Sequence, residues 1–240
     1  MNVIVLMAGP SKDFQEKGHA YPKYLLEIGG EPIIQRVIES IEPLQANLSF
    51  VIRKEDDDSA YIGSTLKILS PNCNIYKISN ITKGAACSAL FAIDAINNGD
   101  ELLIINGDQY IKKGIPESIG HFRKQGLDGG VICFNSVHPR WSYVALDENG
   151  YVCETSEKRP ISNLATAGCY YFKKGSDFVE AAFNTIKKDV NYKGNYYVCS
   201  TYNELILNQE KVGISMIAKD DYISFATPQL YEHYLGHNKD

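Results

Sequence analysis

The feature that most constrains the fold lies in the first 105 residues. Short apolar runs, which predict strands, alternate there with segments whose apolar residues recur at helical spacing. An apolar, β-branched run at Asn2–Met7 is typical of a strand buried on both faces of a parallel sheet. Pro32 then stands at the first position of a predicted helix, which Pro43 ends. Further strands are predicted at 48–52, 74–78 and 101–105, with helices at 61–69 and 84–97. This repeated β-α-β order predicts a mostly parallel, layered sheet.

The pattern changes after Gly129. Apolar residues at 131–134 and 166–172 predict two more strands, and segments 143–146 and 151–154 flank an Asn149-Gly150 turn, the strongest short signal for a β-hairpin. Helices are predicted at 176–188, at 202–208 and after Pro228, with a strand at 212–217. We find no internal repeat and no flexible linker. The sequence therefore predicts one α/β domain, residues 1–240, with a hairpin insertion in a mixed sheet.

Composition excludes several classes of protein. The 240 residues carry a formal net charge of -5 and a pI near 5.6, which argues against a nucleic-acid-binding protein. The six cysteines contain no C-x-x-C pair, as expected for free thiols in a reducing cytoplasm. The first apolar run stops at Ala8 and has no basic residue before it, so we expect neither a signal peptide nor a membrane span.

The stretch VLMAGPSKDFQEKGHAYPKYL, residues 5–25, leads from the first strand into a loop of small and charged residues. Such a strand-loop-helix unit brings backbone N–H groups close to phosphate at the carboxyl end of a strand. Neither G-x-G-x-x-G nor G-x-x-x-x-G-K-[ST] is present, so the loop is neither a dinucleotide motif nor a P-loop.

The same stretch resembles the signature of the sugar-phosphate nucleotidylyltransferases, in which an A-G-x-G-x-R loop precedes a Pro-Lys pair. LMAG at 6–9 and YPKYLLEIGGEPII at 21–34 carry this resemblance. Other segments follow in the family's order: KGAACSAL at 83–90, LLIINGDQYI at 102–111, YVALDENGYVCETSEK at 143–158, ATAGCYYF at 165–172 and FATPQL at 225–230. The resemblance implies a three-layer α/β/α sandwich that is Rossmann-like and glycosyltransferase-A-like. Residues 1–112 would bind the nucleotide and residues 113–240 the acceptor.

In that family a phosphate on the acceptor attacks the α-phosphorus of a nucleoside triphosphate, and pyrophosphate leaves. The resemblance gives the catalytic roles to Lys23, which would stabilise the phosphates, and to Asp108. Asp108 follows an apolar strand, at whose carboxyl end its carboxylate suits Mg²⁺ shared with phosphates. The nucleotide-binding residues implied are Leu6, Ala8, Gly9, Ser11, Lys12, Gly84 and Ala85. The acceptor-binding residues implied are Glu157, Lys158 and Gly168.

Two positions depart from the family pattern. Asp13 stands where the loop's arginine is expected, with Lys12 beside it, and Ser224 stands where many members have a second metal-binding aspartate. Asp220 and Asp221 lie nearby but out of register. His233 and His237 are spaced i, i+4, yet no third ligand is evident, so we do not predict a metal site there.

Three functions follow from this pattern. The first is a Mg²⁺-dependent nucleotidylyltransferase that acts on a triphosphate and a small phosphorylated acceptor for capsule or surface-polysaccharide synthesis. The second is a glycosyltransferase, which usually has Asp-x-Asp where this chain has Gly-Asp-Gln at 107–109. The third is a binding protein that kept the fold without the chemistry. The tyrosine-rich stretch 194–206 leaves a homo-oligomer open.

Overall fold

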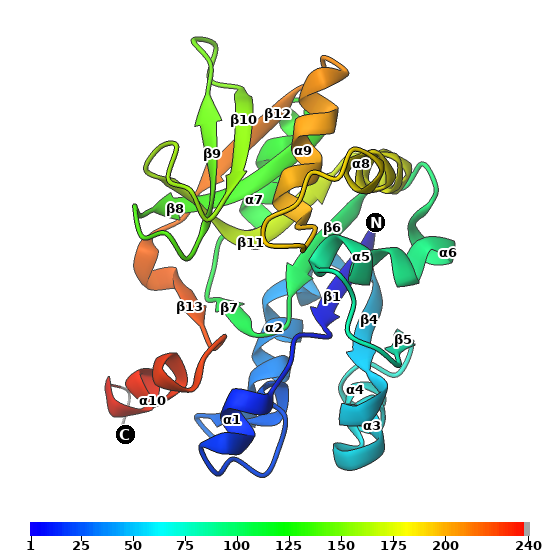
Figure 1. Ribbon diagram of the computed structural model, residues 1–240, viewed down its shortest axis with the longest axis vertical. Helices are drawn as coiled ribbons and strands as arrows, with labels where there is room; N and C mark the ends of the chain where they lie inside the picture. The colour runs from blue at the N-terminus through cyan, green and yellow to red at the C-terminus, as the bar shows by residue number, and fades with distance from the viewer. Residues whose placement is uncertain (238–240) are drawn as a thin grey trace.

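The computed structural model describes residues 1–237. Figure 1 shows a twisted sheet with helices on both sides. The strands are β1 (Asn2–Met7), β2 (Glu27–Ile28), β3 (Glu31–Pro32), β4 (Asn47–Arg53), β5 (Asn74–Ile78), β6 (Leu102–Asn106), β7 (Gln109–Ile111), β8 (Gly129–Asn135), β9 (Ser142–Leu146), β10 (Val152–Glu157), β11 (Leu164–Phe172), β12 (Val212–Met216) and β13 (Tyr222–Ser224).

The helices vary in length from one turn to nearly four. The α-helices are α1 (Lys12–Glu16), α2 (Ile33–Ile41), α3 (Lys54–Ala60), α4 (Ile62–Leu69), α5 (Ala85–Ala89), α6 (Ile93–Ile96), α7 (Ile115–Lys124), α8 (Gly175–Lys187), α9 (Val198–Leu207) and α10 (Pro228–His237). Short 3-10 turns are η1 (Lys23–Leu25), η2 (Glu42–Leu44), η3 (Leu90–Ala92) and η4 (Lys219–Asp221).

The main sheet is mixed, as predicted. Strands β5, β4, β1 and β6 lie side by side and parallel, and β11 then pairs with β6 in the antiparallel direction. Strand β8 pairs antiparallel with β11, and β12 pairs parallel with β8. The β9–β10 hairpin joins the sheet through the pairing of β9 with β11. Because β1 and β6 are parallel, with Leu6 opposite Asn106, the loops that follow both strands open at one edge of the sheet.

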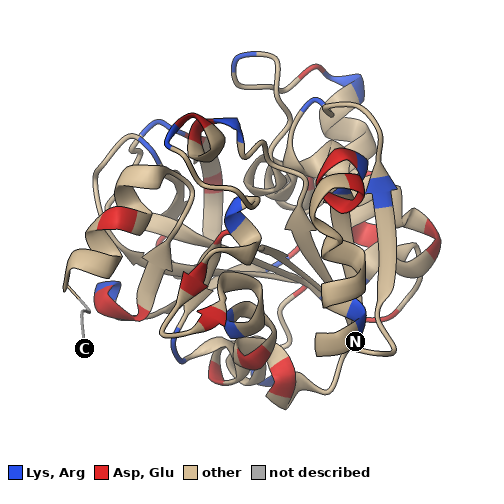
Figure 2. Cartoon of the chain, turned by 90° about the horizontal axis from the view of Figure 1, so that it is seen from below, with Lys and Arg blue, Asp and Glu red and all other residues tan. Residues whose placement is uncertain are grey.

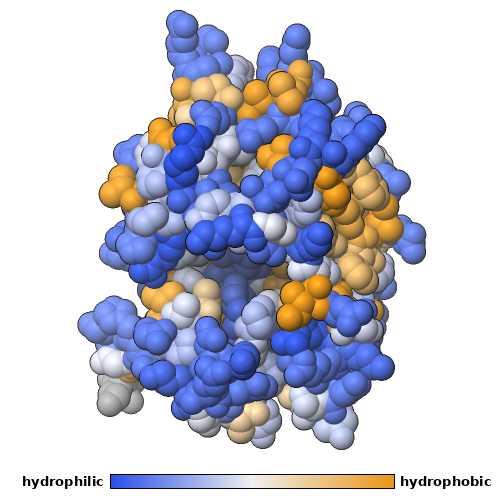
Figure 3. Space-filling view, in the orientation of Figure 1, coloured by the Kyte–Doolittle hydropathy of each residue, from blue (hydrophilic) through white to orange (hydrophobic). Residues whose placement is uncertain are grey.

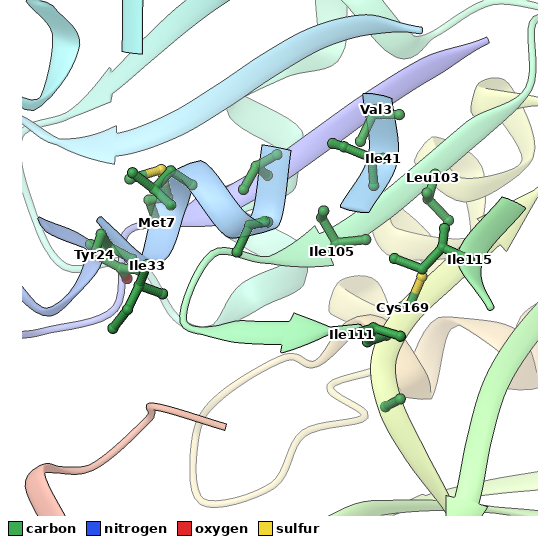
Figure 4. Close-up of a cluster of buried hydrophobic side chains, with 14 of the residues drawn as sticks. Val3, Met7, Tyr24, Ile33, Ile41, Leu103, Ile105, Ile111, Ile115 and Cys169 are labelled. Atoms are coloured by element: carbon green, nitrogen blue, oxygen red, sulfur yellow. The ribbon is translucent and has the colours of Figure 1, made fainter. Parts of the chain in front are cut away.

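Two apolar cores cover the two faces of the sheet. Successive side chains of a strand point to opposite faces, so Val3, Val5 and Met7 enter one core while Ile4 and Leu6 enter the other. Figure 4 shows the first core, where β1 side chains lie among residues of α2, β6, β7 and α7. The second core is closed by α5, α6, α8 and α9. This arrangement confirms the predicted three-layer sandwich.

Several elements differ from the sequence prediction. Helix α7 was not predicted, although Ile115, Ile119 and Phe122 recur at helical spacing and are buried on one face. The single helix predicted at 84–97 is interrupted, because Ala92 leaves helical geometry at φ −96° and ψ 20°. A small antiparallel sheet of β7 and β13 was also missed. The hairpin forms as predicted, with β10 extending to Glu157.

Charged residues of both signs are distributed over the helices and loops in the view of Figure 2. Within residues 1–237, no helix has the length and apolar character needed to cross a membrane. All six cysteines carry free thiols.

Candidate active site

Lys23 and Asp108 meet where the loops after β1 and β6 open. Pro22 has φ −55° and precedes the η1 turn, whose burial of Tyr24 fixes Lys23 in the fold. Asp108 follows the end of β6, and Gly107 N–H donates to the Leu6 carbonyl at 2.8 Å. The Lys23 ammonium lies 2.5 Å from Asp108 Oδ2, although the two residues are 85 positions apart. The structure therefore brings together the two residues to which the resemblance gave catalytic roles.

The Lys23–Asp108 pair is largely removed from water. The Lys23 side chain is 6% exposed and that of Asp108 is 20% exposed. Burial is the largest single effect and disfavours the Lys23 ammonium, but the charge and hydrogen bond of Asp108, together with Tyr24 and Asp56, outweigh it and raise the pKa of Lys23 above its ordinary value. For Tyr24, whose ring lies under the same ammonium, burial disfavours the charged phenolate and so raises the pKa. Lys23 is thus a fixed positive charge at any physiological pH.

A cleft of about 570 Å³ lies over this pair. Figure 3 shows the hollow between the half of the molecule that carries β9, β10 and α9 and the half that carries α1 to α4. Asp108 lines the cleft, whereas Lys23 lies behind Gly9, at which a Cβ would stand 3.3 Å from the Lys23 ammonium. A side chain at position 9 would therefore crowd the Lys23 ammonium, and glycine leaves that space open.

The predicted nucleotide-binding residues divide into two groups. Leu6, Ala8, Gly9, Gly84 and Ala85 line the cleft. Ser11 is buried behind it, where its hydroxyl oxygen accepts from Lys23 N–H at 3.3 Å. Lys12 lies on the outer side of α1, 78% exposed and 3.6 Å from Glu16. The structure thus brings neither Ser11 nor Lys12 to the cleft wall, because the loop folds into α1 around the buried Phe14.

The three predicted acceptor-binding residues all line the cleft. Glu157, at the end of β10, accepts a hydrogen bond from the Ser142 hydroxyl, and its burial raises the pKa of its carboxyl. Lys158 follows with a left-handed backbone, φ 54°. Gly168 sits in an irregular stretch of β11 with φ 60°, and a Cβ there would lie 2.6 Å from Asn106 Nδ2. Gln109 closes this wall by donating its amide to the Gly168 carbonyl at 3.0 Å.

Sequence reasoning missed an aromatic wall on the acceptor side of the cleft. Trp141 stands edge-on to Phe134 and Tyr222, and the Phe134 and Tyr222 rings stack at 4.7 Å. Arg140 lies over the Trp141 ring at 5.4 Å and also lines the cleft. The one available signal was WSY at 141–143, which contains the only tryptophan of the chain and runs into the strand predicted at 143–146.

Ser224 lines the cleft close to Asp108, since Phe225 N–H donates to the Asp108 carbonyl at 2.8 Å. Residues 1–237 contain no group of three or more His, Cys, Asp or Glu side chains arranged to hold a metal ion. Beside each other at this edge, Asp108 offers a carboxylate and Ser224 a hydroxyl. Such a set fits Mg²⁺ that keeps several waters and shares its ligands with substrate phosphates, and it does not fit a closed protein cage.

Asp56 is a second buried acid near Lys23, and one of its oxygens has no hydrogen-bond partner in the described structure. Burial raises the pKa of Asp56 to about 6, against the smaller opposing effect of Arg53. Because the folded pKa exceeds the ordinary value of 3.8, the neutral carboxyl stabilises the fold below about pH 4. This contribution is lost as the pH rises through about 6.

We therefore expect Asp56→Asn to change the pH dependence of stability. At pH 8 the free energy of unfolding of the variant should be roughly 1–2 kcal/mol larger than that of the wild type, because the substitution removes a buried charge. At pH 4.5, where the folded carboxyl is mostly neutral, the gain should be much smaller. Urea denaturation at both pH values checks this, and an equal difference at the two would contradict the assignment of a raised pKa to Asp56.

The Lys23–Asp108 pair thus lies beside a cleft at the edge of a mixed α/β sheet, where the loops after β1 and β6 open. A family model described as nucleotidyl transferase matches residues 3–222, and the chain belongs to that family.

Curated relatives agree with this assignment. The chain is 26% identical over 224 residues to the bifunctional protein GlmU of Methanocaldococcus jannaschii, covering 90% of this chain and 49% of that protein. It is 22% identical over 177 residues to a putative mannose-1-phosphate guanyltransferase of Sulfolobus acidocaldarius, covering 72% and 49%. The chain spans about half the length of these relatives.

Solved structures share the fold. A nucleoside-diphosphate-sugar pyrophosphorylase from Vibrio cholerae RC9 superposes with a TM-score of 0.86 at 23% identity, covering 98% of this chain and 99% of that one. A UDP-glucose pyrophosphorylase solved with UDP-glucose gives a TM-score of 0.78 at 15% identity, covering 98% and 97%. At these identities the likeness establishes the architecture, which the resemblance had implied.

Proposed function

We propose that the protein transfers a nucleoside monophosphate from a nucleoside triphosphate to a sugar 1-phosphate or a related small phosphate ester, and releases pyrophosphate. The observation that carries this proposal is the Lys23–Asp108 pair, whose Asp108 lines the same cleft as Glu157 and Lys158. A cation and an acid on one side and a second cation on the other suit two phosphates that must approach each other.

In the proposed reaction an oxygen of the acceptor phosphate attacks the α-phosphorus. The new phosphorus–oxygen bond forms as the bond to the β-phosphate oxygen breaks, and pyrophosphate carries away the electron pair. Lys23 stabilises the charge on the α-phosphate, exchanging the Asp108 carboxylate for phosphate oxygens. Lys158 holds the acceptor phosphate, and Glu157 accepts a hydrogen bond from an acceptor hydroxyl. Mg²⁺, held by Asp108, water and phosphates, would neutralise further negative charge.

The base-binding side is assigned to residues 1–112 and the acceptor side to residues 113–240. Leu6, Gly84 and Ala85 lie on the first side of the cleft, and Gly168 lies on the second. We place the reaction in the cytoplasm, in the supply of activated sugars for capsule or surface polysaccharide. Free thiols at all six cysteines support a reducing compartment.

The test is pyrophosphate release from the purified protein with Mg²⁺, each common nucleoside triphosphate and a panel of sugar 1-phosphates and small phosphate esters. Release that requires both substrates supports the proposal. Hydrolysis of a nucleotide-sugar without any triphosphate would support a glycosyltransferase instead. Nucleotide binding without turnover across the panel would indicate a relative that kept the fold and lost the chemistry.

Arg140 enters this proposal as a substitute for the missing loop arginine. Asp13 is exposed and Lys12 faces outward, so neither replaces that arginine in the cleft. The charged residues that line the described cleft are Asp108, Arg140, Glu157 and Lys158. A guanidinium binds phosphate through two parallel N–H bonds. We therefore assign Arg140 to a substrate phosphate.

We expect Arg140→Gln to lower kcat/KM by about tenfold, the effect of losing one charge-assisted contact. Arg140→Lys should recover part of the loss. The matched control is Arg159→Gln, since Arg159 is exposed and pairs with Glu154 at 2.7 Å outside the cleft lining. Equal effects of Arg140→Gln and Arg159→Gln on kcat/KM would exclude a specific role for Arg140.

A further inference from the structure

The loop between α8 and α9 contains a compact tyrosine-rich segment, residues 189–197, which we call the tyrosine strap. In Figure 1 it passes close to the start of α5. Tyr192 and Asn195 exchange backbone hydrogen bonds of 2.9 and 3.1 Å. The Tyr196 hydroxyl donates to Asp189 Oδ1 at 2.7 Å. Because these hydrogen bonds join residues within the tyrosine strap to one another, the strap has a defined shape.

On the acceptor side, two rings of the tyrosine strap lie against the Lys158 ammonium. That nitrogen lies 5.7 Å from the centre of the Tyr192 ring and 5.5 Å from the centre of the Tyr197 ring. Rings at this distance attract an ammonium through their negative faces. The Lys158 backbone is also fixed, since its N–H donates to the Trp141 carbonyl at 3.0 Å. Two rings and one backbone bond therefore determine where this charge stands.

On the nucleotide side, the backbone of the tyrosine strap is tied to residues 82–86, which we call the nucleotide loop. Tyr196 N–H donates to the Lys83 carbonyl at 2.8 Å, and the Tyr196 carbonyl accepts from Ala86 N–H at 3.1 Å. Gly84 lies between these bonds with φ 101°, and a Cβ there would overlap the Tyr196 carbonyl and stand 2.7 Å from Tyr196 N. Gly84 must therefore lack a side chain because the tyrosine strap passes against it.

We propose that the tyrosine strap positions Lys158 in the cleft and couples that position to the nucleotide loop. The inference rests on the proposed function, in which Lys158 meets the acceptor phosphate and the nucleotide loop meets the triphosphate. Tyr192, Tyr196 and Tyr197 are positioning residues, because they act through Lys158 and the nucleotide loop. Nucleotide that fixes the loop then strengthens acceptor binding, and acceptor strengthens nucleotide binding by the same factor.

The first experiment needs no substrate. Acetylation of Lys158 by a succinimidyl acetate is followed by peptide mass spectrometry, with exposed Lys124 as the internal reference. Tyr197→Leu should raise the rate at Lys158 by about threefold, because the ammonium loses a ring that holds it. Tyr197→Phe keeps the ring and should leave the rate unchanged. Equal rates in the Leu and Phe variants would overturn the positioning role.

The second experiment tests the coupling. Gly84→Ala should raise the Lys158 acetylation rate by displacing the strap, whereas Gly99→Ala is the control, since nothing lies within 4 Å of a Cβ at Gly99. If Gly84→Ala does not fold, it is replaced by Tyr196→Phe, which removes the hydrogen bond from Tyr196 to Asp189 that holds the shape of the strap. A Lys158 rate that matches the wild type in the folded variant would overturn the coupling.

Kinetics then separate this inference from the proposed function. With a phosphate ester that supports pyrophosphate release, Tyr197→Leu should raise the acceptor KM by about fivefold and change kcat less. A lower kcat with an unchanged acceptor KM would contradict positioning of Lys158. If no ester supports release, the proposed function fails while the acetylation rates still decide the role of the tyrosine strap.

Discussion

Lys23→Met is expected to lower kcat/KM for pyrophosphate release by at least about 100-fold, the usual scale for losing a preorganised charge at a phosphoryl-transfer centre. Methionine keeps the length and the apolar stem of the side chain, so the change isolates the ammonium. Lys23 is 6% exposed and pairs with Asp108 at 2.5 Å. Steady-state kinetics with the active triphosphate and acceptor measure the loss.

The matched control for Lys23→Met is Lys17→Met, because Lys17 is an exposed lysine of the same segment, outside the lining of the cleft. It should change kcat/KM by less than about twofold. Circular dichroism and thermal unfolding establish that both variants are folded. Near-normal turnover in a folded Lys23→Met protein would remove Lys23 from the mechanism.

Asp108→Asn should have the second large effect, again at least about 100-fold in kcat/KM. The substitution keeps the shape of the side chain, and it removes both the carboxylate offered to Mg²⁺ and the counter-charge of the buried Lys23. The concentration of Mg²⁺ that gives half-maximal rate should rise. Stability should fall by roughly 2–4 kcal/mol, because a buried cation loses its partner.

Asp94→Asn is the control, since Asp94 is an exposed carboxylate on α6. It should leave the rate, the Mg²⁺ requirement and the free energy of unfolding near the wild-type values. An Asp108→Asn protein with an unchanged Mg²⁺ requirement would show that Asp108 does not hold the metal, even if its turnover falls.

Local patterns in the sequence were sufficient to predict the sheet that forms the site. Nearly every residue of the run at Asn2–Met7 is apolar because both faces of β1 are covered. Such a run can be recognised as a buried strand from the sequence alone. The Pro-Lys pair and Asp108 could be recognised because each matches a short motif of the family. Each also follows a strand of a parallel sheet, and the carboxyl ends of such strands meet at one edge. The parallel order of β1 and β6 brings the two loops to that edge, and the η1 turn then places the Lys23 ammonium 2.5 Å from Asp108.

Other parts of the site depend on contacts between distant segments. Lys12 was expected at the nucleotide, but Phe14 packs against His19 and Tyr231 of α10, which turns the loop into a helix that points Lys12 outward. No local pattern contains that contact. The enclosure of Lys158 by Tyr192 and Tyr197 likewise joins residues more than thirty positions apart, and tyrosines at this spacing alone predict only core or interface packing.

The most direct test of the central claim is a crystal structure with Mg²⁺, a non-hydrolysable nucleoside triphosphate analogue and the active acceptor. The account predicts the α-phosphate over Gly9, with the Lys23 ammonium turned from Asp108 to a phosphate oxygen and the acceptor phosphate beside Lys158. A triphosphate bound elsewhere, with Lys23 still paired to Asp108 behind Gly9, would contradict it.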